Sequence, residues 1–275
     1  MRLRSILFFA ACAATLLVTL GLLTVVLGAI VLRGIAAINL GFLIRPAEGF
    51  GQGGGIFYQI VGTVILIFAA AALSLPLALG AAIYQTQYLS PSRQRLANTF
   101  IYGLNGVPTI IFGLFGYIFF GVFLRMGVSW VSGAFILGLM ILPTLVASIK
   151  EAIESIPASY RETALSLGFS PGALVKAVII PYSRAGIITG LLLGLSRAAG
   201  ETAAIMFTAT AFSGARIPRT FFEPVATLQT HILVLSQAGL DPRATLNAWG
   251  AALVLVGLVF IIGLASAFIR RRANF

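Results

Sequence analysis

Two short segments place charged residues where the surrounding sequence is apolar. Residues 161–168 read Arg-Glu-Thr-Ala-Leu-Ser-Leu-Gly and lie between two hydrophobic runs, whereas Arg197 and Glu201 lie inside a third run. A charge at the centre of a membrane helix costs at least about 2.5–3.5 kcal/mol, so such residues are expected to serve a function. The i, i+4 spacing of Arg197 and Glu201 lets the two side chains approach each other on one helix face.

The helix that carries these two charges is expected to have one narrow polar stripe. Three glycines spaced four residues apart, from position 186 to 194, fall on the same side as Arg197 and Glu201. Such glycines permit another helix to approach closely, so the stripe must face protein or a water-filled cavity. Two interpretations stay open: Arg197, Glu201 and the neighbouring Thr202 form a structural or gating lock, or they line a pathway in which Arg197 meets an anionic solute.

The residues of a catalytic or metal site are not found together in this sequence. His231 is the single histidine and Cys12 the single cysteine, which leaves no cluster of metal ligands and no serine–histidine–aspartate arrangement. We expect His231 to be a surface or packing residue and Cys12 to be a buried one. The glycine-rich run 49–54 matches a dinucleotide fingerprint formally but lacks its strand and helix, and is expected to be a loop. We therefore predict a non-enzyme without metal or cofactor.

The composition is that of a membrane protein. Of the 275 residues, 59% are hydrophobic and 9% are charged, whereas a soluble domain carries about 25% charged residues. A bilayer core needs about 20 helical residues to cross it. Six spans are predicted, at residues 5–32, 58–84, 98–124, 130–149, 185–211 and 247–269. We expect an all-α membrane protein with six transmembrane helices in one domain, residues 1–275.

The basic residues indicate how the chain is oriented. The formal net charge is +11, but Lys and Arg lie mainly at the ends of apolar runs, which argues against nucleic-acid binding. With the N-terminus in the cytoplasm, 11 of the 18 basic residues lie inside and 6 outside. Because basic residues favour the cytoplasmic side, both termini and residues 150–184 are expected to be cytoplasmic.

Residues 150–184 are predicted to form a helical hairpin. Pro157 ends the preceding helix, and residues 158–167 form a short helix that Gly168 can end with a positive φ. Ser170 and Pro171 are typical of the N-cap and the first residue of another helix. Such a hairpin presents a compact knob, which either packs under the bundle or inserts into a groove of a partner.

The same loop resembles the EAA loop of ABC-importer permeases, whose pattern is E-A-A-x3-G-x9-I-x-L-P. The resemblance is carried by Glu162, Thr163, Ala164, Gly168, Val178, Ile180 and Pro181. Three positions depart from the pattern, each with a residue of similar size, and the spacing is intact. The resemblance implies a loop that fits a cleft in a separate cytoplasmic ATPase. The implied coupling residues are Tyr160, Arg161, Glu162, Thr163, Ala164, Gly168 and Pro181.

A second resemblance is to phosphate-importer permeases of the PstA type. It is carried by residues 197–203, 206–209 and 222–229. It implies the MetI-like fold of type I ABC importers and translocation of inorganic phosphate across the bacterial inner membrane by alternating access. The implied partners are a PstC-like second permease, an ATPase dimer and a periplasmic phosphate-binding protein. A permease for another oxyanion such as sulfate or molybdate, and a non-ABC channel or scaffold, stay as alternatives.

Overall fold

The structure is a computed structural model that describes residues 2–51, 53–212, 216–238 and 241–273, and most of these are helical. The α-helices are α1 (Arg2–Gly34), α2 (Leu40–Ile44), α3 (Phe57–Tyr88), α4 (Pro91–Asn105), α5 (Thr109–Gly116), α6 (Trp130–Glu154), α7 (Ala158–Ser166), α8 (Pro171–Leu174), α9 (Ile180–Gly200), α10 (Ala203–Thr208), α11 (Leu228–Gln237) and α12 (Pro242–Ala273). Two short 3₁₀-helices are η1 (Ile35–Ala37) and η2 (Gly49–Gly51), and two short π-helices are η3 (Tyr117–Phe123) and η4 (Val175–Ile179). The strands β1 (Ala47–Glu48) and β2 (Gly53–Gly54) pair antiparallel. The predicted all-α class is confirmed.

Five helices are long and apolar enough to cross a membrane. They are Arg4–Ala37, Phe57–Tyr88, Trp130–Glu154, Pro171–Gly200 and Pro242–Ile269. The remaining predicted span, residues 98–124, is a bent pair formed by Pro91–Asn105 and Thr109–Phe123, whose axes differ by 91°. Counted as one span, this pair gives the six that the sequence predicts.

The bend in the third span follows from Gly106 and Pro108. The N–H of Gly106 bonds to the carbonyl of Gly103 at 3.0 Å, which tightens the last turn of α4. Val107 precedes a proline, which disfavours the helical region for it, and Pro108 is the extended N-cap of α5, with ψ 136°. An apolar run that reads as one helix is therefore divided by local sequence.

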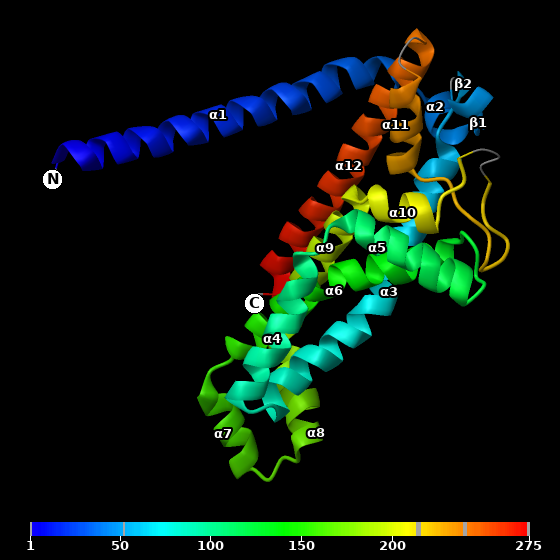
Figure 1. The fold of residues 1–275 in the computed structure, drawn as a ribbon. Coiled ribbons are helices and arrows are strands. Elements are labelled where there is room, and N and C mark those ends of the chain that lie inside the picture. The colour runs from blue at the N-terminus through cyan, green and yellow to red at the C-terminus, as the bar shows by residue number, and fades with distance from the viewer. Residues whose placement is uncertain (1, 52, 213–215, 239–240, 274–275) are drawn as a thin grey trace.

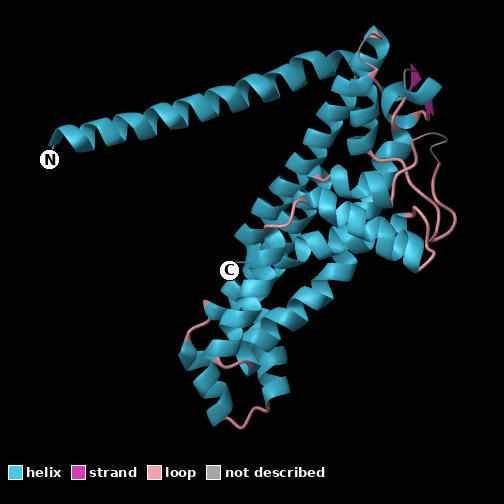
Figure 2. Cartoon of the chain, in the orientation of Figure 1, coloured by secondary structure: helices cyan, strands magenta, loops and turns pink. Residues whose placement is uncertain are grey.

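The centre of the bundle is formed by α3, α6 and α9 (Figure 1). Small residues allow these helices to approach closely. The Oγ of Ser74 on α3 donates a hydrogen bond to the carbonyl of Gly138 on α6 at 2.7 Å. A Cβ added at Gly138 would lie 2.9 Å from the Oγ of Ser74. Loops interrupt the helices at both ends of this body and also within it (Figure 2).

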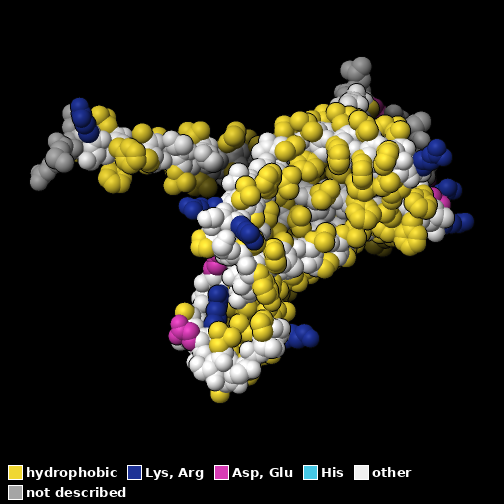
Figure 3. Space-filling model, turned by 60° about the horizontal axis from the view of Figure 1, so that its bottom comes forward, with side chains coloured by type: hydrophobic (Ala, Val, Ile, Leu, Met, Phe, Trp, Pro, Cys, Tyr) yellow, Lys and Arg dark blue, Asp and Glu magenta, His cyan; other side chains and the backbone are white. Residues whose placement is uncertain are grey.

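Helix α1 extends away from the body (Figure 1). Its side chains are exposed along almost its whole length. Its C-terminal end touches α12, where Gly34 lies against the backbone of Trp249 and the Arg33 guanidinium lies 5.1 Å from the Trp249 ring centroid. The expectation that Cys12 is buried is wrong, because Cys12 lies on this projecting part of α1 and is exposed. Apolar side chains cover much of the visible surface of the body and of α1 (Figure 3).

Candidate functional site

The loop predicted to be cytoplasmic folds as two helices joined at Gly168, at the end of the body opposite the small sheet (Figure 1). Helix α7 follows Pro157 and ends at Ser166. Gly168 has φ +78°, the left-handed region that favours glycine. The Oγ of Ser170 accepts a hydrogen bond from the N–H of Ala173 at 3.3 Å, as an N-cap does. The local predictions for this segment are confirmed, and we call residues 157–170 the knob.

The second helix of the hairpin is continuous with the fifth predicted span. Helices α8, η4 and α9 form one rod, Pro171–Gly200, so residues 171–184 belong to the same helix as the span. Pro181 lies in this rod and has no N–H to donate. The preceding turn, Val175–Ile179, is π-helical, and the N–H of Ile180 bonds to the carbonyl of Val175. The wider turn accommodates the proline without ending the helix.

Two of the predicted coupling residues attach the knob to the bundle. The Nη2 of Arg161 donates a hydrogen bond to the carbonyl of Ile153 at 2.7 Å, near the C-terminus of α6, where carbonyls lack helical partners. The ring of Tyr160 packs against that of Tyr182, with the centroids 4.8 Å apart. Ala164 is the residue of α7 that is buried against the core. These contacts fix the direction in which the knob points.

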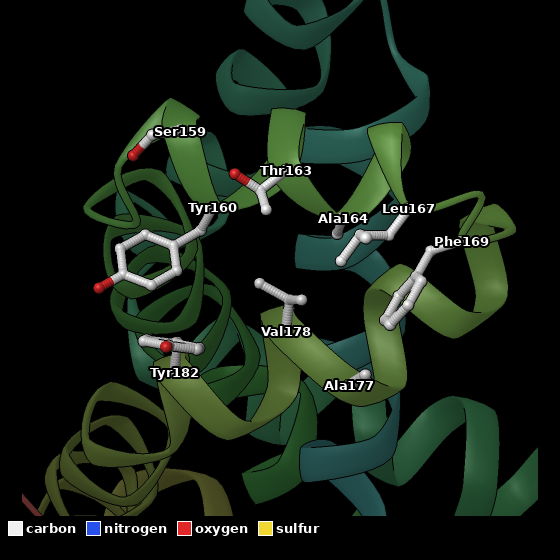
Figure 4. A pocket seen from close by; sticks show the side chains of 9 residues that line it. All are labelled: Ser159, Tyr160, Thr163, Ala164, Leu167, Phe169, Ala177, Val178 and Tyr182. Atoms are coloured by element: carbon white, nitrogen blue, oxygen red, sulfur yellow. The ribbon is translucent and has the colours of Figure 1, made fainter.

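A groove of about 540 Å³ separates α7 from the start of the following helix (Figure 4). Its lining residues are Ser159, Tyr160, Thr163, Ala164, Leu167, Phe169, Ala177, Val178 and Tyr182. Figure 4 shows Val178 pointing from the second helix toward α7. Glu162 and Gly168 are exposed and do not line the groove. The motif residues thus divide into a set that faces the groove and a set that is free to meet another surface.

Arg197 joins three helices beside a break in one of them. Its Nη1 donates hydrogen bonds to the Oδ1 of Asn105 at 3.0 Å and to the Oγ1 of Thr144 at 3.2 Å. Asn105 is the last residue of α4, at the bend, and Thr144 follows Pro143 on α6. Neither Asn105 nor Thr144 is among the predicted site residues. The dipeptide Asn105-Gly106, followed by Pro108, is the local sequence signal that α4 ends there.

The prediction of one continuous helix over residues 185–211 is wrong. Helix α9 ends at Gly200, Glu201 has an extended backbone with ψ 125°, and Thr202 is the N-cap of the short helix α10. Glu201 is therefore the C-cap residue of α9 and the last residue that keeps a helical position relative to Arg197. Among the described residues no ion pair joins these two side chains, since Arg197 turns to Asn105 and Thr144 instead. Arg197, Glu201 and Thr202 are all half-buried.

The glycine stripe of α9 faces protein, as predicted. A Cβ added at Gly190 would lie 2.9 Å from the Cβ of Ser148, and one added at Gly194 would lie 3.5 Å from the Cγ of Leu145. A Cβ added at Gly186 would overlap the side chain of Ala152. All of these neighbours belong to α6, so the stripe is the contact surface between α9 and α6.

His231 is a packing residue on α11. Its ring lies against Gly51, and its Nδ1 lies 3.5 Å from the Nε2 of Gln59 on α3. Burial lowers the pKa of His231 to about 4, so its imidazole is neutral at physiological pH. In the part of the chain that the structure describes, no three His, Cys, Asp or Glu side chains gather as metal ligands do.

The structure is thus a helical membrane body with a helical knob at one end and the half-buried Arg197 between broken helices. Residues 74–274 match the family model of the binding-protein-dependent transport system inner membrane component. The chain belongs to this family.

Relatives agree with this assignment, and a solved structure shares the fold. The chain is 31% identical over 237 residues to the phosphate transport system permease protein PstA of Xylella fastidiosa, covering 85% of this chain and 81% of that protein. It is 30% identical over 253 residues to the probable ABC transporter permease protein YqgI of Bacillus subtilis, covering 87% and 86%. A chain of the bacterial alginate ABC transporter, solved with its periplasmic protein, shares the fold with a TM-score of 0.70 at 16% identity, covering 98% of this chain and 95% of that one.

Proposed function

We propose that this chain is one half of the permease of an ATP-driven importer for inorganic phosphate. Its partners are a PstC-like second permease, a cytoplasmic ATPase dimer and a periplasmic phosphate-binding protein. The chain lies in the bacterial inner membrane with both termini in the cytoplasm, and it uses no cofactor or metal of its own. The observation that carries the choice of solute is the half-buried Arg197 in a chain 31% identical to a PstA protein.

Arg197 has the chemistry to meet a phosphate ion. A guanidinium is a cation that carries five N–H donors in a planar fork. Two hydrogen bonds hold it to Asn105 and Thr144. Both of these bonds leave from Nη1, so among the described residues the donors on Nη2 and Nε have no hydrogen-bond partner. A tetrahedral oxyanion could take these donors as a bidentate partner while Arg197 stays in place.

The knob supplies the connection to ATP hydrolysis. Glu162 and Gly168 are exposed at its surface, whereas Arg161 and Tyr160 hold it against α6 and α9. A force applied by an ATPase at the exposed side would therefore reach the helix that carries Arg197, because Pro171–Gly200 is one rod. Alternating access then needs no catalytic residue on this chain.

The solute is tested by uptake of radioactive phosphate into proteoliposomes that contain all subunits. ATP-dependent phosphate uptake is expected, and Arg197→Ala should abolish it while the complex still assembles. Excess sulfate and molybdate should compete poorly. Competition by either anion as strong as that by phosphate would assign the permease to that oxyanion, and normal uptake in Arg197→Ala would remove Arg197 from the pathway.

The ATPase contact is tested by crosslinking. Cysteines placed at the exposed Ser159 and Ser166 in a Cys12→Ser chain should crosslink to a cysteine in the cleft of the co-expressed ATPase. Failure at both positions in a complex that still hydrolyses ATP would contradict the role of the knob.

A further inference from the structure

The end of α9 is held by a side chain from another helix. The Nε2 of Gln229, on α11, donates a hydrogen bond of 2.7 Å to the carbonyl of Ala199. Gln229 is 4% exposed and Ala199 is fully buried. The last four carbonyls of a helix have no partner within it, so Gln229 supplies the N–H that the carbonyl of Ala199 lacks once α9 has ended.

The same carbonyl has a competing donor in the chain itself. If α9 continued, the carbonyl of Ala199 would accept the N–H of Ala203, four residues later. The sequence favours that continuation, because residues 185–211 are an apolar run without proline. Gly200 is the weakest helix former at the break, and a Cβ there would meet nothing within 4 Å. The break is thus maintained by tertiary contacts.

The segment before α11 also bonds to the chain just after α10, at the end of α10 that lies away from the break. The N–H of Val225 donates to the carbonyl of Ala209, and the carbonyl of Val225 accepts the N–H of Ala211, both at 2.9 Å. Ala209 directly follows α10. Residues 225–229 therefore bond to the chain on both sides of α10, and α10 turns away from the direction of α9 (Figure 1).

We propose that Gln229 is a positioning residue that keeps α9 and α10 apart, and that its release lets them join into one helix in which Arg197 and Glu201 pair. In the broken form Arg197 is bound to Asn105 and Thr144, and Glu201 lies beyond the helix end. In the joined form Arg197 leaves Asn105 and Thr144 and pairs with Glu201, which stands at i, i+4 on the same face of a continuous helix. The hydrogen bond from Gln229 to the carbonyl of Ala199 then decides whether Arg197 binds α4 and α6 or pairs with Glu201.

Helix α11 connects the hydrogen bond from Gln229 to the end of the bundle that lies opposite the knob. His231, two residues from Gln229, packs against Gly51 of the turn between β1 and β2, and the Nδ2 of Asn247 donates to the carbonyl of Gly51 at 3.0 Å. The N–H of Leu228 donates to the Oγ1 of Thr63 at 2.9 Å. A partner that displaces this turn would move α11 and with it Gln229. The consequence for transport rests on the proposed function, whereas the change of helix shape does not.

The test measures the helix directly. In a Cys12→Ser chain within the assembled transporter, spin labels are placed at Leu193→Cys on α9 and Met206→Cys on α10. A joined helix sets these positions about 20 Å apart, and a change of direction between Gly200 and Ala203 should give the broken form a different separation. Gln229→Met keeps the size of the side chain and removes the donor, so it should shift the labels toward about 20 Å and lower phosphate uptake about tenfold. Gln237→Met, at an exposed position of the same helix, should change neither.

Gly200→Ala provides a second variant that needs no change at Gln229. It raises helix propensity at the break and should shift the label separation in the same direction. Wild-type separation in both Gln229→Met and Gly200→Ala would overturn the proposal, even if uptake fell. Absence of phosphate uptake by the wild-type complex would refute the proposed solute and leave the spin-label result standing.

Discussion

The Nη1 of Arg197 lies 3.0 Å from the Oδ1 of Asn105, a residue 92 positions earlier in the chain. This hydrogen bond joins two interrupted helices, because Asn105 ends α4 at the 91° bend and Arg197 lies three residues before α9 ends. Interrupted helices in transport proteins leave backbone and polar groups available where a solute passes. The candidate site is therefore a junction of two helix breaks.

The anchoring of Arg197 predicts the effect of removing its partners. Asn105→Leu combined with Thr144→Val should lower the rate of phosphate uptake by about tenfold or more, since each bond to a charged group contributes about 1.5–3 kcal/mol. The side chain of Arg197 would remain but lose its direction. Thr99→Val is the matched control, because the hydroxyl of Thr99 bonds only the carbonyl of Arg95 in its own helix. Equal uptake in the double variant and the control would contradict a positioning role for these bonds.

The contact between α6 and α9 predicts a stability effect. Gly186→Ala should lower the free energy of unfolding by about 1–3 kcal/mol, because the added methyl group overlaps the side chain of Ala152. Thermal unfolding of the purified complex measures the change. Gly80→Ala on α3, where a Cβ meets nothing within 4 Å, should not destabilise. Adding Ala152→Gly to Gly186→Ala should restore the melting temperature, and failure to do so would place the defect elsewhere.

The turn of the knob predicts a coupling defect. Gly168→Ala forces a residue with a Cβ into φ +78°, at a cost of about 1–2 kcal/mol. The knob should reorient, and the complex should hydrolyse ATP with less solute imported per ATP. Gly172→Ala, on α8 with ordinary φ and open space, serves as the control for adding a methyl group. An unchanged ratio of imported phosphate to hydrolysed ATP in Gly168→Ala would show that the turn is not needed for coupling.

The buried His231 predicts a pH dependence of stability. Its pKa is lowered by burial from 6.5 to about 4, so the unfolded chain binds a proton at a pH at which the folded chain does not. Stability should therefore fall as the pH drops from about 6.5 to about 4, by up to about 3 kcal/mol. Melting temperatures at pH 7.5 and pH 5 measure this. His231→Gln should show a smaller drop between the two pH values, and an identical drop would assign the effect to other groups.

Local sequence accounts for the knob and for most of the helix positions. Pro157, Gly168 and Ser170 act on their own neighbours in the chain, through a missing N–H, a permitted positive φ and a side-chain cap. Apolar runs of about 20 residues have few alternatives in lipid, because every backbone group must be bonded within the protein. The bend at Pro108 was also present as a local signal, but its angle depends on the packing of α5 against α10.

By itself the sequence determined the class of the fold, the helices that can cross a membrane and the form of the knob, because each follows from hydrophobicity or from residues close together in the chain. Only the tertiary structure decided where α9 ends and what Arg197 touches. The carbonyl of Ala199 takes its donor from Gln229, 30 residues away, and Arg197 takes its acceptors from α4 and α6. Such long-range hydrogen bonds override a local preference for continued helix, and no periodicity in the sequence records them.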